Sequence, residues 1–263
     1  MQVTVLGSGS AGNATLVSTL RTRLLVDAGL SRRETLKRLA AAGEATDGVR
    51  AILISHEHAD HVQGLLGLAE EWNATVYLTA GAAEALDWAR ALAQVEEFRP
   101  GERFPIGDIE VTPFLTPHDA AEPVGFTFQA EGVKAALVTD IGFITELTKQ
   151  QVRGADCLII ESNHDLEMLR HGPYPWFVKQ RVLSRLGHLS NLELARFLEE
   201  DFDGAARYLV LAHLSENNNH PEIARMNASE ALDRRRARFP LSFPRQPELL
   251  LTNQRAPLGP IRL

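Results

Sequence analysis

The sequence predicts an α/β (four-layered α+β) fold, in which two β-sheets are sandwiched between helices. Two strand-rich halves, each accompanied by helical segments, lead to this prediction. The chain has 263 residues, enough for a large hydrophobic core, and it contains no Ser- or Pro-rich linker, low-complexity tract or repeat. We therefore expect residues 1–263 to form a single domain.

Local sequence patterns predict the individual strands and helices. Short β-branched runs with glycine-bearing connections open the sequence and predict a meander of strands. The predicted strands are 3–6, 15–18, 24–27, 51–54, 75–79, 109–115, 124–130, 133–138, 156–160 and 207–211. The predicted helices begin at Ser31 and near Val62 and also cover 81–92, 143–151, 175–184, 191–200 and 221–236. Ser31 with Glu34, and Ser190 with Glu193, have the spacing of a capping box.

The charge of the chain is low and unevenly distributed. A net charge of −7 argues against a large protein surface that binds nucleic acid regardless of base sequence. From Arg225 onward there are eight arginines against three carboxylates, which gives about +5 on the tail and about −12 on the rest. A solvated helix face is the favoured interpretation of Arg234–Arg236, and an edge that contacts phosphates is the alternative.

The single cysteine is informative about the cellular compartment. Cys157 excludes an internal disulfide, which suits a reducing cytoplasm, and its apolar run 156–160 favours a small buried side chain over a nucleophile. The first residues enter a strand directly and predict no signal peptide. No run approaches the ~18 apolar residues of a membrane span. We expect a cytoplasmic protein with no membrane partner.

A glycine-rich stretch, 7–13, resembles a dinucleotide loop only superficially. That loop must open a helix, whereas the residues after Asn13 predict another strand. A tight turn that brings Asn13 and backbone N–H groups near a site is the better interpretation.

A cluster of metal-ligand residues follows the strand 51–54. His56, His58, Asp60 and His61 fall within six positions, and alternate residues of an extended loop face the same way. Imidazole and carboxylate together suit zinc, manganese or iron better than magnesium or calcium alone. The spacing differs from the zincin pattern, which has a second histidine at the fifth position. The sequence therefore predicts a metal centre.

The segment 56–61 resembles the signature of the metallo-β-lactamase superfamily, whose fold is an αββα sandwich. The resemblance implies two metal ions. His56, His58 and His118 would hold the first, Asp60, His61 and His213 the second, and Asp140 would bridge them. Asp140 and His213 each end a predicted strand, where a rigid scaffold can present ligands. Asp27 resembles the superfamily's aspartate that orients a metal ligand by hydrogen bonding. The alternative is that Asp27 only forms a turn.

The metal set serves acyl and phosphoryl transfer alike, so other segments must indicate the reaction. The context of His118 in 116–119 is similar to the phosphodiesterase branch of the superfamily. The segments 161–164 and 187–191 resemble those of tRNA 3′-processing ribonucleases. That resemblance implies that Glu161 orients His188 as a general acid, and we count Asp60 with them as catalytic. A buried histidine that caps the following helix is the alternative for His188.

Over about residues 1–225 the chain resembles the YycJ (WalJ) group of metallo-β-lactamase-fold proteins. The matching segments include 6–13, 55–61, 118–123, 161–165, 172–175, 187–191 and 211–218. This resemblance implies a 5′→3′ exonuclease in DNA repair, with zinc or manganese in its site and iron as a further candidate. The expected partners are the ends of DNA, with RNA as a second candidate.

Three further residues are candidate substrate contacts: Asn13, His164 and Tyr174. His164 lies beside the loop 172–175, with Arg170, Lys179 and Arg181 close in sequence. A rim that contacts phosphates would position a strand without reading its sequence, and Tyr174 could stack on a terminal base. The alternative function is a small-molecule hydrolase of a lactone, thioester or cyclic phosphodiester. A non-catalytic protein that keeps the fold is the third possibility, which the complete ligand set disfavours.

Overall fold

The structure is a computed structural model that describes residues 1–89, 92–240, 243 and 246–263. The chain has two compact units. The first consists of Met1–Leu115, Ala120–Val133 and Thr252–Leu263, and the second of Thr116–Asp119 and Lys134–Leu251. Among the described residues, no helix combines the length and the apolar character that a membrane crossing requires.

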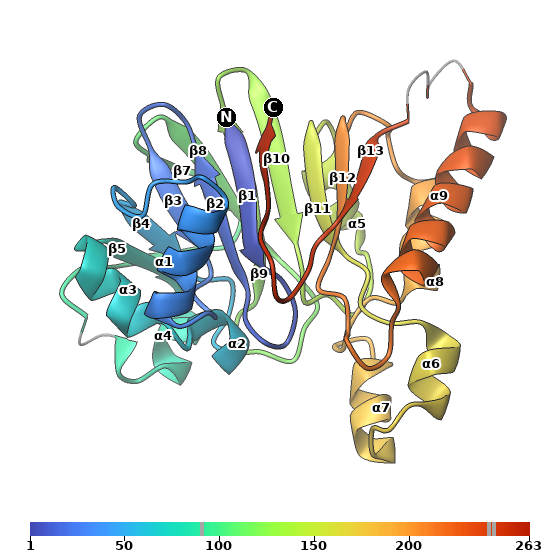
Figure 1. Ribbon diagram of the computed structural model, residues 1–263, viewed down its shortest axis with the longest axis horizontal. Coiled ribbons are helices and arrows are strands. Elements are labelled where there is room, and N and C mark those ends of the chain that lie inside the picture. Colours follow the sequence, from blue (N-terminus) through green and yellow to red (C-terminus); the bar gives the residue numbers. More distant parts are fainter. Residues whose placement is uncertain (90–91, 241–242, 244–245) are drawn as a thin grey trace. The chain divides into compact units, whose positions relative to one another are not determined.

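The first unit is built on a seven-stranded sheet in the order β14-β1-β2-β3-β4-β5-β6 (Figure 1). Its strands are β1 (Gln2–Gly7), β2 (Ala14–Ser18), β3 (Arg23–Val26), β4 (Ala51–Leu53), β5 (Thr75–Thr79), β6 (Val95–Phe98) and β14 (Leu258–Arg262). The strands from β14 to β3 pair antiparallel, and those from β3 to β6 pair parallel. The carboxyl ends of β3 and β4 therefore lie at the same edge of the sheet.

Helices and a second set of strands complete the first unit. The helices are α1 (Arg32–Ala41), α2 (Ala59–Val62), α3 (Leu65–Trp72) and α4 (Ala80–Ala85). α1 contacts β1 and α3, while α4 contacts β5 and β6. Apolar side chains of sheet and helices form one buried cluster, which includes Leu25, Ile52, Leu65 and Leu78. β7 (Phe104–Ile106), β8 (Ile109–Leu115) and β9 (Val124–Ala130) form an antiparallel meander.

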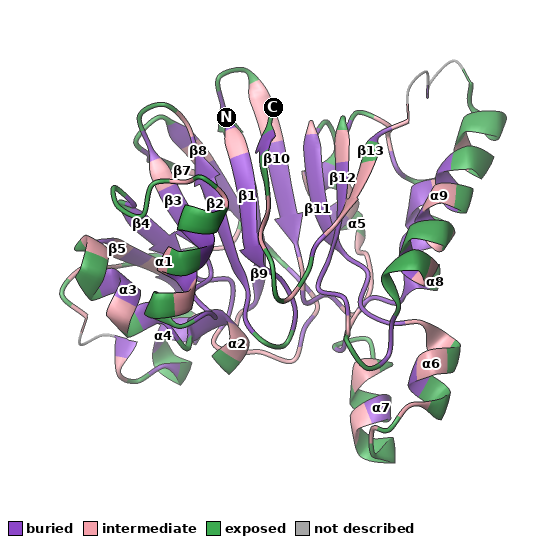
Figure 2. Cartoon of the chain, viewed as in Figure 1, coloured by how far each residue is buried: buried purple, intermediate pink, exposed green. Residues whose placement is uncertain are grey.

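The second unit contains four parallel strands in the order β13-β12-β11-β10. They are β10 (Val133–Val138), β11 (Cys157–Glu161), β12 (Tyr208–Ala212) and β13 (Glu248–Leu251). The helices are α5 (Glu146–Val152), α6 (Leu166–His171), α7 (Trp176–Val182), α8 (Asn191–Glu200) and α9 (Pro221–Arg238). α8 packs on α9 (Figure 1), and α7 contains exposed, intermediate and buried residues (Figure 2). The near-continuous apolar sequences of β11 and β12 suit strands that are buried throughout.

The structure confirms each predicted strand to within one residue at either end. It also confirms two predicted N-caps: Ser31 Oγ accepts a hydrogen bond from Glu34 N at 3.3 Å, and Ser190 Oγ accepts one from Glu193 N at 3.1 Å. The helix expected over 81–92 is wrong in its length. α4 ends at Ala85, where Leu86 leaves the helical conformation and is buried, and residues 90 and 91 of that range lie outside the described residues.

Two interpretations of single features are also confirmed. Cys157 is fully buried, and burial raises the pKa of its thiol to about 12, so it behaves as a small core side chain. In the arginine run of α9, Arg234 is half-exposed and bonds Glu199 of α8 at 2.7 Å, as expected for a solvated helix face. Arg235 donates to the Glu199 carbonyl oxygen at 2.8 Å, so the run also ties α9 to α8.

Candidate metal centre

The candidate ligands of each unit come directly after parallel strands. In the first unit Asp27 follows β3, and the histidine cluster begins just beyond β4. In the second unit Asp140 follows β10, Glu161 ends β11 and His213 follows β12. Carboxyl ends of neighbouring parallel strands share one edge of a sheet, so each group is gathered by strand direction alone.

Three of these residues have unusual backbone conformations. Asp27, Asp140 and His213 have φ angles of 59°, 56° and 56°, in the left-handed region that non-glycine residues seldom adopt. Such conformations cost on the order of 1–3 kcal/mol and persist only where the surroundings impose them. Their coincidence with predicted site residues indicates that the strand ends are shaped to aim these side chains.

In the first unit, Asp27 is the hub of a buried network. Its Oδ1 accepts from Ser55 N at 2.8 Å and its Oδ2 lies 2.9 Å from His61 Nδ1. Ser55 Oγ adds contacts of 3.0 Å to His56 Nδ1 and 3.1 Å to His61 Nδ1. A carboxylate only accepts, so the His61 proton lies on Nδ1 and Nε2 is the accepting atom of the ring. Orientation of this kind is typical of histidines that bind metal.

Asn13 supports the same cluster from the glycine-rich turn. Its side-chain Nδ2 lies 3.0 Å from His61 Nε2 and 3.3 Å from Asp60 Oδ2, and its backbone N–H donates to the Asp60 carbonyl oxygen at 2.8 Å. Its Oδ1 accepts from Gly9 N at 2.8 Å. Asn13 is only 5% exposed. Asn13 therefore lies near the site as predicted, but its contacts are with candidate ligands.

Gly29 allows the loop after β3 to pack directly on the histidine cluster. A Cβ on Gly29 would overlap the carbonyl oxygen of Asp60. We expect Gly29→Ala to destabilise the protein by roughly 1–3 kcal/mol and to weaken metal binding, because the backbone of Asp60 must move. Thermal unfolding and metal titration measure the two effects.

Gly67→Ala in α3 is the matched control. Its Cβ would meet only Arg32 side-chain atoms at 3.5–3.7 Å, an ordinary contact, and alanine favours a helix over glycine by about 0.5–1 kcal/mol. Equal stability of the two variants would refute the packing role of Gly29.

In the second unit, Glu161 is a fully buried carboxylate with four donors. Oε1 lies 2.8 Å from His188 Nδ1 and 3.0 Å from His213 Nδ1. Oε2 accepts from Ile141 N at 2.8 Å and from Leu189 N at 3.3 Å. Two rings are thus aimed by one carboxylate. The His188 side chain remains 20% exposed, whereas that of Glu161 is 0% exposed.

The ionisation of this pair follows from its contacts. Burial alone would raise the pKa of Glu161, but the His188 charge and the hydrogen bonds from His188 and His213 lower it to about 2. Burial opposes the charged form of His188, yet Glu161 raises the pKa of that ring above its usual value. Glu161 is therefore an anion over the working pH range, and it favours a protonated His188.

His118 and His213 present their Nε2 atoms to Asp140. His118 Nδ1 donates to the carbonyl oxygen of Gly187 at 3.1 Å, since a carbonyl can only accept. The Nε2 atoms of His118 and His213 lie 3.9 and 3.5 Å from Asp140 Oδ1. Burial lowers the pKa of His118, which favours the neutral ring that a metal requires.

The donor set of the second unit fits a divalent metal ion. One ligand-type atom from each of Asp140, Glu161, His188 and His213 lies within 4.8 Å of all the others. Two ligands about 2.0–2.2 Å from one ion would lie roughly 3–4 Å apart, the separation found between Asp140 and the Nε2 atoms. Imidazole nitrogens oriented by oxygen acceptors, beside a carboxylate, are typical of zinc and manganese sites.

The structure corrects one predicted substrate contact. His164 is only 1% exposed and burial lowers its pKa to about 4, so its side chain lies inside the second unit and not on a rim. Tyr174 is half-buried, and its hydroxyl accepts from Asn217 Nδ2 at 3.3 Å. The roles of the predicted ligands and of His188 stay predictions.

Several supporting residues were missed from sequence. Ser55, between its strand and the histidine cluster, bridges Asp27 to two rings. Asn163 donates to the His213 carbonyl oxygen at 2.9 Å. Asn219 Nδ2 holds the backbone of Ser162 and Asn163 at 2.9 and 3.0 Å. The run of asparagines after His213 was the available signal, because buried amides commonly bond the backbone.

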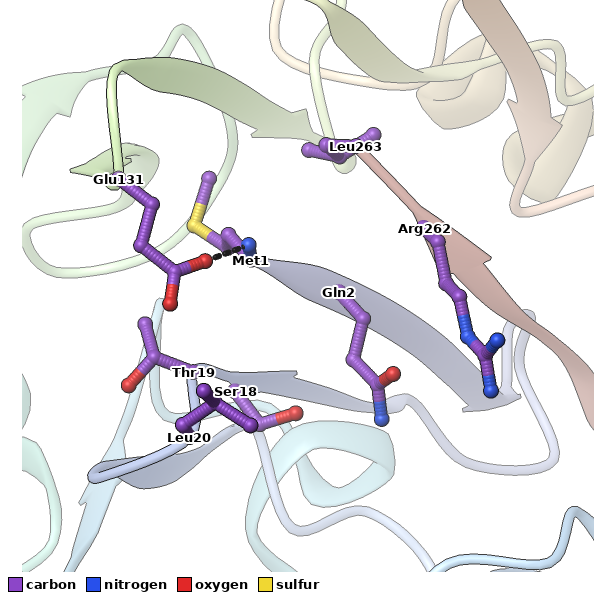
Figure 3. A pocket seen from close by; sticks show the side chains of 8 residues that line it. All are labelled: Met1, Gln2, Ser18, Thr19, Leu20, Glu131, Arg262 and Leu263. Carbon is purple, nitrogen blue, oxygen red and sulfur yellow. Dashed lines mark hydrogen bonds and ion pairs between the residues drawn. The ribbon is translucent and has the colours of Figure 1, made fainter.

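A hollow elsewhere in the first unit lacks this chemistry (Figure 3). It has a volume of about 290 Å³ and is lined by Met1, Gln2, Ser18, Thr19, Leu20, Glu131, Arg262 and Leu263. The amino group of Met1 pairs with Glu131 there. Ser18 pairs with Arg23 at the opposite end of β3 from Asp27, so this hollow lies away from the histidine cluster.

Comparison with known proteins identifies the family. Residues 22–214, well over half of the chain, match the domain described as "Beta-lactamase superfamily domain". The chain belongs to this superfamily. It is therefore an enzyme of a metal-dependent hydrolase family. Among solved structures, the metallo-β-lactamase fold protein YhfI from Bacillus subtilis has a TM-score of 0.73 at 19% identity, covering 98% of both chains. The predicted metallo-β-lactamase fold is thus confirmed.

Two curated relatives are similar to this chain over most of their length. The exodeoxyribonuclease YycJ of Bacillus anthracis is 39% identical over 236 residues, 89% of each chain. The exodeoxyribonuclease WalJ of Streptococcus pneumoniae is 37% identical over 227 residues, 84% of each chain. The resemblance to the YycJ/WalJ group is confirmed.

Proposed function

We propose that this chain is a phosphodiesterase that uses two divalent metal ions and acts as a 5′→3′ DNA exonuclease. The names of the curated relatives support exonuclease activity on DNA. The proposal includes DNA repair as the setting and the cytoplasm as the compartment, which suits a chain with one buried cysteine. Zinc or manganese is the proposed metal. The proposed ligands are His56, His58, Asp60, His61, His118, Asp140 and His213.

The observation that carries the proposal is the hydrogen bond between Glu161 and His188. The departing oxygen of a phosphodiester is a strongly basic alkoxide, and its departure is faster when an acid protonates it. Glu161 fixes His188 through Nδ1 at 2.8 Å and raises the pKa of the ring. A thioester hydrolase has less need of such a pair, because its thiolate leaving group is weakly basic.

The residues divide the work as follows. Glu161 holds Nδ1 of His188, so the Nε2–H of the protonated ring points away from Glu161 and can donate to the departing oxygen. The ring is 20% exposed, which lets a substrate reach it. Asp27 and Ser55 keep the first-unit histidines in position. When bound, the metal ions supply a hydroxide at neutral pH and neutralise charge that develops on the phosphate.

Digestion of end-labelled linear duplex DNA tests the proposal. With Mn²⁺ or Zn²⁺ present, we expect progressive loss of nucleotides from the 5′ end. Chelation should abolish the activity, and adding back either metal should restore it, because the metal supplies the attacking hydroxide. Metal content per chain is measured in parallel.

Two other outcomes of these assays would overturn part or all of the proposal. A metal-replete protein that leaves DNA and RNA intact, but hydrolyses a lactone, a thioester or a cyclic phosphodiester, would replace the nuclease with the small-molecule hydrolase. Digestion from the 3′ end would retain the phosphodiesterase and overturn the polarity.

A further inference from the structure

Helix α7 displays two aromatic side chains to solvent. Trp176 is 68% exposed and Phe177 is 72% exposed, more than any other Trp or Phe in the described part of the chain. Leu183 and Leu186, just beyond the helix, are 44% and 50% exposed. Large apolar side chains that are grouped and exposed usually mark a binding surface. Figure 2 shows exposed residues along α7, with intermediate and buried residues between them.

The same segment is locally cationic in an acidic chain. Residues 168–192 contain four basic residues and no Asp or Glu, whereas the whole chain carries −7. Two neighbouring carboxylates offset part of this charge: Glu167 pairs with Arg170, and Asp119 pairs with Arg181. Counting both leaves a local charge of +2, from four cations and two anions. The charge is complementary to a polyanion and unfavourable for a cationic partner.

The support under the aromatic pair is fixed. Lys179 is 9% exposed, and its Nζ donates to the carbonyl oxygen of Arg170 at 2.8 Å, which holds α7 to the end of α6. A Cβ on Gly172 would overlap Asn218 Oδ1, so the turn between the helices is closely packed. Rigid presentation lowers the entropy that binding must otherwise remove.

Helix α7 is also connected directly to the proposed acid. The backbone N–H of His188 donates to the carbonyl oxygen of Val182, the last residue of α7, at 3.0 Å. From Trp176 to Val182 the helix rises about 9 Å, at 1.5 Å per residue. A strand stacked as in B-DNA advances about 3.4 Å per nucleotide, so that length corresponds to roughly two to three stacked nucleotides. Aromatic side chains one length of α7 away from the Val182 carbonyl suit bases a few positions from the bond that His188 would help to break.

We propose that Trp176 and Phe177 form a base-stacking platform for single-stranded DNA next to the hydrolysed end. The proposal rests on the proposed nuclease function and deepens it. Stacking accepts any base because every base has a π-face, and the nearby cations contact the backbone without reading sequence. The platform would hold a frayed end in register with His188.

Tryptophan fluorescence gives a direct test on the metal-loaded protein. The chain has three tryptophans, and Trp72 and Trp88 pack against the core of the first unit, so a Trp72→Phe/Trp88→Phe variant reports on Trp176 alone. A short phosphorothioate oligothymidylate, which resists hydrolysis, is the probe. We expect saturable quenching of Trp176. Absence of quenching overturns the platform.

Substitutions separate stacking from apolar docking. Trp176→Ala/Phe177→Ala and Trp176→Leu/Phe177→Leu should each weaken binding of the fluorescently labelled probe by about 10-fold or more. Trp176→Phe/Phe177→Tyr should retain binding within about 2-fold, since the π-faces remain. Wild-type affinity in the leucine pair would overturn the proposal and indicate an apolar protein partner or a second copy of the chain.

Phe239→Ala is the matched control. Phe239 is 36% exposed and lies beside Arg235 and Arg238, so it is an aromatic side chain with cations at another position of the same unit. It should leave probe affinity unchanged. DNA hydrolysis with no loss of affinity in the alanine pair would overturn only the platform. Quenching of Trp176 without DNA hydrolysis would support the platform and contradict the nuclease.

Discussion

Replacing His188 by alanine should lower kcat on DNA by about 10²–10⁴-fold while the protein keeps its metal. A positioned acid contributes roughly that factor when the departing oxygen is a poor leaving group. Metal retention is expected because Glu161 keeps His213 Nδ1 at 3.0 Å and two backbone donors after the substitution, so the carboxylate stays satisfied. Single-turnover kinetics on end-labelled DNA and metal analysis measure the two quantities.

The same variant distinguishes an acid from a structural histidine. With bis(p-nitrophenyl) phosphate, whose leaving group departs as a stable phenolate, His188→Ala should lose far less activity than with DNA. The wild-type rate should fall as pH rises through the raised pKa of His188, because deprotonation removes the donated proton, and the variant should lack this limb. His171→Ala, at an 82% exposed ring, is the control. Equal losses on both substrates would contradict the acid role.

The meeting of Asp140 and His213 could be predicted because both residues follow strands. Asp140 and His213 end apolar runs, and the strand direction then brings them to one edge of the sheet. The double use of Glu161 could not be predicted. Sequence indicates that a carboxylate ends β11, but only packing shows that both His188 and His213 reach the same oxygen. The burial of His164 was missed because its neighbours in sequence are polar.

The missed elements of the fold have physical reasons as well. β6 has two adjacent exposed glutamates, which hide the alternation of a half-buried strand. β14 contains a glycine and a proline and pairs with β1 from the other end of the chain. Proline is tolerated there because β14 is an edge strand, a context that local pattern does not reveal. α6 has six residues, too few for a helical period to be recognised.

Glu161→Gln should lower kcat at least as far as His188→Ala and should also weaken metal binding by about 10–100-fold. The carboxylate accepts four hydrogen bonds: two ring N–H groups meet Oε1, and two backbone N–H groups meet Oε2. A glutamine amide has one accepting oxygen and one donating nitrogen. Whichever way it turns, its NH₂ group faces donors, so one pair of hydrogen bonds is lost.

The two losses have separate physical origins, which makes the variant informative. Loss of the hydrogen bond to His188 removes the general acid. Loss of the hydrogen bond to His213 frees a proposed metal ligand to rotate, and such a change typically lowers metal affinity by about 10–100-fold. Competition against a chromophoric chelator measures metal affinity, and kinetics at saturating metal isolate the acid. We expect excess metal to restore only part of the rate. Complete restoration would show that Glu161 serves the metal ligand alone, and unchanged metal affinity would show that it serves His188 alone.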